Sequence, residues 1–147
     1  MLEVNNLTSN EIDEERLKDL TQVVLEEEDE EGSVSLAIVG ENRMRKLNKR
    51  YRGKNKVTDV LSFPEQEVQI GDFKIGPKEE TKGLGEIVIC LKRVKKNARR
   101  NNKEVKEEFT LVLIHGILHL LGYDHQEEDE AREMERKQKQ YLNKVIS

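Results

Sequence analysis

The sequence predicts an α+β fold with a small mixed β-sheet and helices packed around a central apolar helix. The chain has 147 residues, the usual size of one domain, so we expect a single domain over residues 1–147. Helical and strand-like patterns alternate only in part, which favours α+β over a regular α/β arrangement. The segment from Glu104 to Leu121 is apolar on every side, as expected of a buried central helix.

The first half of the chain contains alternating strand and helix signals. Asn10 is predicted to cap a helix whose apolar stripe runs to about Leu25. Alternating residues predict a strand at Ser33–Val39, and helical spacing then predicts a basic helix that stops at Gly53. A short strand at Leu2–Asn5 precedes them.

The second half begins with a strand predicted at Val57–Phe63 and ended by Pro64. Glu65–Leu84 is rich in glycine and charge and is predicted to be mostly loop, with a possible small hairpin at Val68–Ile75. Further along we expect a buried strand at Gly85–Leu91, a basic helix at Lys92–Asn101 and a surface helix at Glu127–Val145.

The composition argues against several classes of protein. No run of about twenty apolar residues exists, so no membrane partner is expected. The first residues lack a basic segment followed by an apolar run, which argues against a signal peptide. Cys90, the one cysteine, has no partner for an internal disulfide, lies in an apolar run and is predicted to be a buried structural thiol. We therefore expect a cytoplasmic protein, and a monomer.

Opposite charges are segregated along the chain although the net charge is only −4. Acids are concentrated at Glu11–Glu31 and Glu127–Glu135, and bases at Arg43–Lys56 and Lys92–Lys103. The basic segments predict either a face that binds a polyanion or ordinary solvated helix faces.

All three histidines lie in one short run, His115-Gly-Ile-Leu-His119-Leu-Leu-Gly-Tyr-Asp-His125. The i, i+4 spacing puts His115 and His119 on one helix face, and Gly122 allows the chain to turn so that His125 can return as a third ligand. Three imidazoles suit zinc and leave one position open, as in catalytic sites. We therefore predict one Zn²⁺ per chain, against the alternative of three unrelated hydrogen-bonded histidines.

This spacing matches the His-Glu-x-x-His-x-x-Gly-x-x-His run of metzincin proteases, and a zincin-like arrangement is therefore expected. Gly116, however, stands where those proteases have their glutamate base. This departure argues against peptide hydrolysis. The ion itself still lowers the pKa of its bound water. In addition, a substrate with an internal nucleophile, such as the RNA ribose 2′-hydroxyl, would need less help from a protein base.

The histidine run resembles the HGxLHLxGYDH motif of the YbeY family of bacterial rRNA maturation factors. Two further blocks, Tyr51–Gly53 followed by Thr58–Pro64, and Leu84–Ile89, also resemble that family. Val57 departs from it, since the family often has proline there, and the Glu65–Leu84 loop looks long.

The resemblance implies a metal-dependent endoribonuclease specific for single-stranded RNA. It implies a role in rRNA processing at the 3′ end of small-subunit 16S rRNA, in ribosome assembly and in quality control, with the small ribosomal subunit as partner. It also implies that Arg52 is catalytic, and a guanidinium is suited to stabilise charge on a scissile phosphate. The candidates for base stacking are few: Tyr51, Phe63, Phe73 and Tyr123.

Two other functions stay open at this point: a non-catalytic ribosome-assembly factor with a structural metal, and a zinc-dependent protease. Ser62 and Asp124 are expected near the site. Asp124 either orients an imidazole or caps the turn after Gly122. Met134 is expected in the core and not in a metzincin-type methionine turn.

Overall fold

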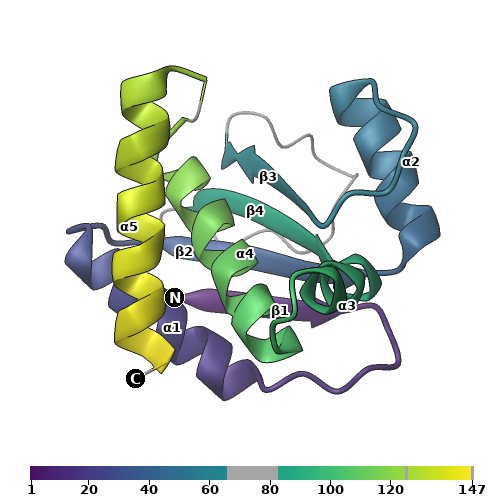
Figure 1. Ribbon diagram of the computed structural model, residues 1–147, viewed down its shortest axis with the longest axis horizontal. Helices are drawn as coiled ribbons and strands as arrows, with labels where there is room; N and C mark the ends of the chain where they lie inside the picture. Colours follow the sequence, from purple (N-terminus) through teal and green to yellow (C-terminus); the bar gives the residue numbers. More distant parts are fainter. Residues whose placement is uncertain (66–82, 125, 147) are drawn as a thin grey trace.

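The computed structural model describes residues 1–65, 83–124 and 126–146 (Figure 1). Four strands and five helices are present in this part of the chain. In chain order they are β1 (Leu2–Asn6), α1 (Glu14–Glu27), β2 (Ser33–Val39), α2 (Glu41–Arg52), β3 (Val60–Pro64), β4 (Gly83–Cys90), α3 (Leu91–Arg100), α4 (Val105–Leu120) and α5 (Glu128–Ile146). The predicted hairpin at Val68–Ile75 lies outside the described residues.

The strands form one mixed sheet in the order β1-β2-β4-β3. β1, β2 and β4 are parallel, whereas β3 runs antiparallel to β4 and forms an edge. Every residue of β2 is buried, because helices cover both faces of this inner strand. The predicted α+β fold with a small mixed sheet is confirmed.

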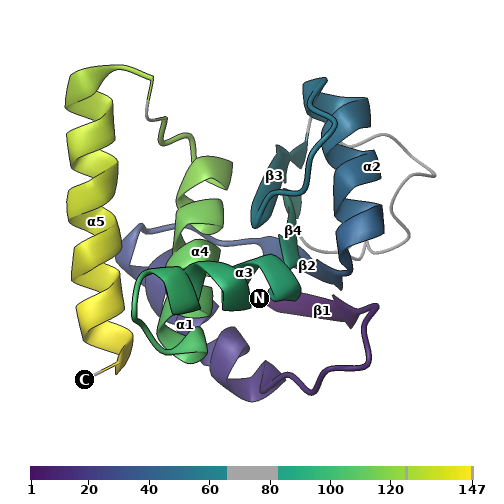
Figure 2. The same ribbon diagram turned by 45° about the vertical axis from the view of Figure 1, so that its right-hand side comes forward.

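Two apolar clusters hold the layers together. The larger one lies between the sheet and helices α1, α4 and α5, and includes Leu36, Ile87 and Tyr141. The smaller one lies between the opposite face of the sheet and α2, where Met44 packs near Val88. Figure 2 shows α2 and α5 far apart on opposite sides of the molecule, with β3 and β4 between them.

The central position of α4 follows from its composition. Its buried residues include Phe109, Leu113 and Ile117, which face in different directions around the helix axis. It contacts α1, α3, α5, β3 and β4. The C-terminal turns of α4 therefore end between the edge strand β3 and helix α5.

β3 begins and ends later in the sequence than the strand predicted at Val57–Phe63. β3 spans Val60–Pro64, so Pro64 is its last residue, paired with Gly85. An edge strand tolerates proline because one of its sides needs no N–H donor. Val57 and Thr58 are not in the strand, since the Asn48 amide donates to the Lys56 carbonyl at 3.0 Å and holds this segment against α2.

The predicted cap of the first helix was also wrong. Asp13, not Asn10, caps α1: its carboxylate accepts from the Arg16 N–H at 3.2 Å. The Asn10 carbonyl instead accepts from the Asn6 side chain at 2.6 Å, so Asn10 belongs to the preceding turn.

Among the described residues, no helix combines the length and the apolar character needed to cross a membrane.

Candidate functional site

His115 and His119 converge at the C-terminal end of α4. Their Nε2 atoms are 3.0 Å apart, and the ring planes are inclined by 76°. Two nitrogens bound at about 2.0–2.1 Å to one tetrahedral ion would be separated by only slightly more than this. The 3.0 Å separation also fits a hydrogen bond between the two rings. A bound metal would take the place of the proton that the two nitrogens share.

Gln138 on α5 holds the other nitrogen of His115. Its amide oxygen Oε1 accepts a hydrogen bond from His115 Nδ1. An amide oxygen is only an acceptor, so Nδ1 carries the proton and Nε2 keeps its lone pair for the shared point with His119. Sequence reasoning missed Gln138, although it lies four residues after Met134 on the predicted inward stripe of that helix.

Gly122 makes the sharp turn that follows α4. It has φ of +101°, and its N–H donates to the His119 carbonyl at 3.1 Å. The Tyr123 N–H donates to the Leu118 carbonyl at 3.0 Å, which completes a Schellman motif. The predicted glycine turn is confirmed. His125 lies outside the described residues, and within these no group of three His, Cys, Asp or Glu side chains is placed to hold a metal.

Gly116, between the two histidines, faces the sheet and not the site. A Cβ added there would lie 3.0 Å from Cγ2 and 3.1 Å from Cδ1 of Ile87, and 3.2 Å from Oγ of Ser62. A larger side chain would therefore require Ile87 and Ser62 to shift. At the position where the protease pattern has glutamate, α4 packs closely on β3 and β4.

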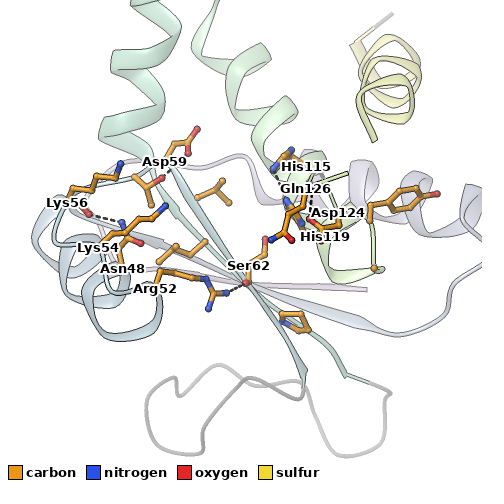
Figure 3. A pocket seen from close by; sticks show the side chains of 16 residues that line it. Asn48, Arg52, Lys54, Lys56, Asp59, Ser62, His115, His119, Asp124 and Gln126 are labelled. Carbon is orange, nitrogen blue, oxygen red and sulfur yellow. Dashed lines mark hydrogen bonds between the residues drawn. The ribbon is translucent and has the colours of Figure 1, made fainter. Parts of the chain in front are cut away.

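The histidines open into a polar pocket of about 780 Å³ (Figure 3). One wall carries Arg52, Lys54 and Lys56 from the end of α2 and the segment after it. His115, His119, Gly122, Tyr123, Asp124 and Gln126 form the opposite wall. β3 runs between the walls and contributes Ser62. A wall of cationic side chains that faces the nitrogens of His115 and His119 suits an anionic substrate.

Arg52 is positioned by the edge strand. Its Nη2 donates to the Ser62 carbonyl at 2.8 Å, and Cζ lies 4.9 Å from the centre of the Phe63 ring. The edge strand β3 packs beside α4, and Arg52 lies in the same pocket as His115 and His119.

The polar residues expected near the site have distinct roles. Ser62 donates from Oγ to the Gly116 carbonyl at 3.4 Å. Asp124 accepts at Oδ1 from the Gln126 N–H at 3.2 Å, which fits one of its two expected roles, that of capping the turn. Met134 is a core residue with 2% exposure, as expected. Cys90 is a buried thiol, and burial raises its pKa.

Only one of the four aromatic candidates for base stacking lines the pocket. Phe63 is fully buried, and Tyr51 packs against it with ring centres 5.1 Å apart. Tyr123 is in the pocket wall, and Phe73 lies outside the described residues. Recognition through stacked bases therefore has little support from the pocket.

The largely buried carboxylate of Glu28 stabilises the turn that follows α4. Glu28, just after α1, accepts from Tyr123 at 2.6 Å, from Lys137 at 3.1 Å and from Tyr141. Desolvation by itself would raise the pKa of Glu28, but these hydrogen bonds outweigh it and lower that pKa. Burial, followed by the hydrogen bond to Glu28, raises the pKa of Tyr123 to about 12. The network ties the turn to α1 and α5.

Helices α3 and α5 differ in the ion pairing of their cations. On α5, five cations pair with carboxylates: Arg132, Arg136, Lys137, Lys139 and Lys144. On α3, only Lys92 forms an ion pair, with Glu41, within the described part of the chain. We call the other exposed or half-exposed cations of this helix the α3 basic face: Arg93, Lys95, Lys96, Arg99 and Arg100.

The α3 basic face adjoins the pocket. Asn97, one turn from Arg93 and Arg100 on the same helix, donates to Asp59 at 3.5 Å, and Asp59 lines the pocket. Positive charge thus extends from Lys54 and Lys56 past Asp59 to α3. Figure 3 shows Asp59, Lys54 and Lys56 together at one end of the pocket.

A mixed sheet, a central helix ending in two histidines, and an open pocket with a cationic wall define a small α+β protein with a candidate site for an anionic substrate. The model of the family described as "Endoribonuclease YbeY" matches residues 3–146, and the chain belongs to this family.

Relatives of the same description support this membership. The chain is 40% identical over 137 residues to that of Acidothermus cellulolyticus, covering 90% of this chain and 84% of the relative. It is 39% identical to that of Bacillus subtilis, covering 90% and 87%. A Thermotoga maritima protein with a known solution structure superposes with a TM-score of 0.65 at 32% identity, covering 99% of this chain and 89% of that one.

Proposed function

We propose that this protein is a metal-dependent, single-strand-specific endoribonuclease that processes the 3′ end of small-subunit rRNA during ribosome assembly. One observation carries the proposal: two histidine Nε2 atoms 3.0 Å apart face a pocket whose opposite wall is cationic. Family membership supports RNA as the substrate, and the buried reduced thiol of Cys90 is consistent with action in the cytoplasm.

His115, His119 and His125 are the proposed ligands of one Zn²⁺. The contact between His115 Nδ1 and the Gln138 amide oxygen supports this assignment, because a proton on Nδ1 would leave Nε2 able to bind a metal. When bound, such an ion supplies Lewis acidity toward a water molecule or a phosphate oxygen.

Arg52 is proposed to contact the scissile phosphate. Its place in the pocket beside Lys54 and Lys56 supports a role in binding and orienting the backbone. A preorganised guanidinium stabilises negative charge that develops on the phosphate. The scarcity of exposed aromatic side chains supports recognition through phosphates, with little preference for base sequence.

The test combines metal analysis with cleavage of matched single-stranded and double-stranded RNA. We expect one zinc per chain, cleavage of the single strand only, and loss of cleavage on chelation with recovery on adding zinc. Full metal content in His115→Ala, His119→Ala and His125→Ala would exclude the ligand set.

The same assay separates the alternatives. Metal binding without cleavage would indicate an assembly factor with a structural metal. Hydrolysis of casein would indicate a protease, which the packing of Gly116 against Ile87 and Ser62 disfavours.

A further inference from the structure

Helix α5 contacts His115, one of the proposed metal ligands, through the side chain of Gln138. Gln138 is partly buried and follows His115 by 23 residues in the chain. The face of α5 that carries it also carries the buried Met134 and Tyr141. Gln138 is thus a neutral amide on an otherwise apolar inward stripe, in a helix whose other polar residues mostly face outward.

We propose that Gln138 is a positioning residue that selects the metal-binding tautomer of His115. This inference rests on the proposed metal site. An imidazole in water exchanges its proton between Nδ1 and Nε2, and only the form with a free Nε2 lone pair can bind a metal at the point shared with His119. The Gln138 oxygen accepts from Nδ1, so it stabilises that form before any ligand binds.

The neutral amide also affects the charge of the site. A carboxylate in the same place would make His115 a stronger donor and would add a negative charge next to the substrate. Gln138 contacts the ring without adding this charge to a pocket that is lined by Arg52, Lys54 and Lys56 and also by Asp59 and Asp124.

The neighbouring residues make the assignment specific. Gln138 lies on α5, and its oxygen contacts Nδ1 of His115, whereas His119 contacts the other ring nitrogen, Nε2, and Tyr123 donates to Glu28. Lys137, the residue before Gln138, is bound to Glu28 at 3.1 Å, which fixes this turn of α5. The position of Gln138 is therefore supported by a second, independent contact of the same helix turn.

Three variants test the inference. Gln138→Leu removes the acceptor with little change of volume, and Gln138→Glu keeps an acceptor. Gln140→Leu makes the same chemical change at an exposed position of the same helix and is the control. Circular dichroism and urea unfolding establish that each variant is folded.

Two readouts are independent of RNA cleavage. Nitrogen-15 NMR of histidine-labelled, metal-free protein reports the tautomer of His115, and competition with a chromophoric chelator gives the affinity for zinc alone. In wild type, Gln140→Leu and Gln138→Glu we expect the Nδ1–H form. In Gln138→Leu we expect a mixture of tautomers and zinc affinity about 10- to 100-fold lower.

An unchanged His115 tautomer in Gln138→Leu would overturn the inference, and so would zinc affinity equal to that of Gln140→Leu. Equal losses in Gln138→Leu and Gln138→Glu would also overturn it, because the acceptor would then be irrelevant. The tautomer readout needs neither metal nor RNA, so failure of the proposed nuclease activity would be seen separately.

Discussion

The Ser62 hydroxyl donates a hydrogen bond to the Gly116 carbonyl, with 3.4 Å between the two oxygen atoms. The carbonyl of the same Ser62 accepts from Arg52 at 2.8 Å. One residue of the edge strand thus contacts both the helix turn between the two histidines and the proposed phosphate-binding arginine. The distance between the two halves of the pocket is therefore set by β3.

Gly116→Ala should destabilise the protein. Alanine improves helix propensity by up to about 1 kcal/mol, but crowding against Ile87 and Ser62 costs about 1–3 kcal/mol. We expect a net loss of about 1 kcal/mol in the free energy of unfolding in urea, and a larger loss for Gly116→Glu. Gly40→Ala is the control, since an added Cβ there meets nothing within 4 Å. Wild-type stability of Gly116→Glu would contradict the steric explanation.

Arg52→Ala should reduce the cleavage rate by about two to three orders of magnitude while metal content and fold remain. Arg52→Lys should recover only part of the rate, because lysine keeps the charge but loses the planar fork. Rates, zinc stoichiometry and circular dichroism are measured together. Arg50→Ala, at an exposed position outside the pocket lining, is the control. Unchanged cleavage in Arg52→Ala would remove Arg52 from the mechanism.

The double change Arg99→Ala, Arg100→Ala should weaken binding of single-stranded RNA and reduce its salt dependence. Each lost phosphate contact lowers the slope of log K against log salt by about 0.7 for single strands. Arg132→Ala, Arg136→Ala removes the same charge from α5, where both arginines are ion-paired, and should have less effect. Equal slopes in the two double variants would exclude the α3 basic face as an RNA contact.

Glu28→Gln should be less stable than wild type at pH 7, by about 2 kcal/mol, because hydrogen bonds to a charged group are lost. The pKa of Glu28 is lowered in the folded protein, so its stabilisation is present above about pH 4.5 and disappears as the pH falls through the folded pKa. Urea unfolding at pH 7 and pH 3 checks this. A difference that is the same at both pH values would show that the carboxylate charge is unimportant.

Glu86→Gln should stabilise the protein at alkaline pH. Glu86 is buried, and its Oε2 has no hydrogen-bond partner among the described residues; burial, with a smaller contribution from Glu65, raises its pKa to about 7. Between about pH 4.5 and 7 the unfolded chain releases a proton that the folded chain retains, so wild-type stability falls as the pH rises. Glutamine avoids this loss. We expect Glu86→Gln to exceed wild type at pH 8, with the difference shrinking toward pH 5.

The fold and the histidine pair could be predicted because they depend on local patterns. The buried faces of α4 and β2 follow from apolar periodicity, and the approach of His115 to His119 follows from the helical repeat. The end of β3 near Pro64 was predicted, but its start was placed too early, because Val57 and Thr58 have high β propensity and yet lie outside the strand. Gln138 was missed because glutamine is common on helix surfaces, and only the packing of α5 against α4 turns it toward His115.

The order of these residues along the chain has a consequence for synthesis. A growing chain emerges from its N terminus, so the cationic wall formed by Arg52, Lys54 and Lys56 exists well before the histidines of α4. Gln138 is added later still, after both His115 and His119. The residues proposed to bind the phosphate backbone are therefore synthesised before the proposed metal ligands, and the side chain proposed to orient His115 is synthesised after both.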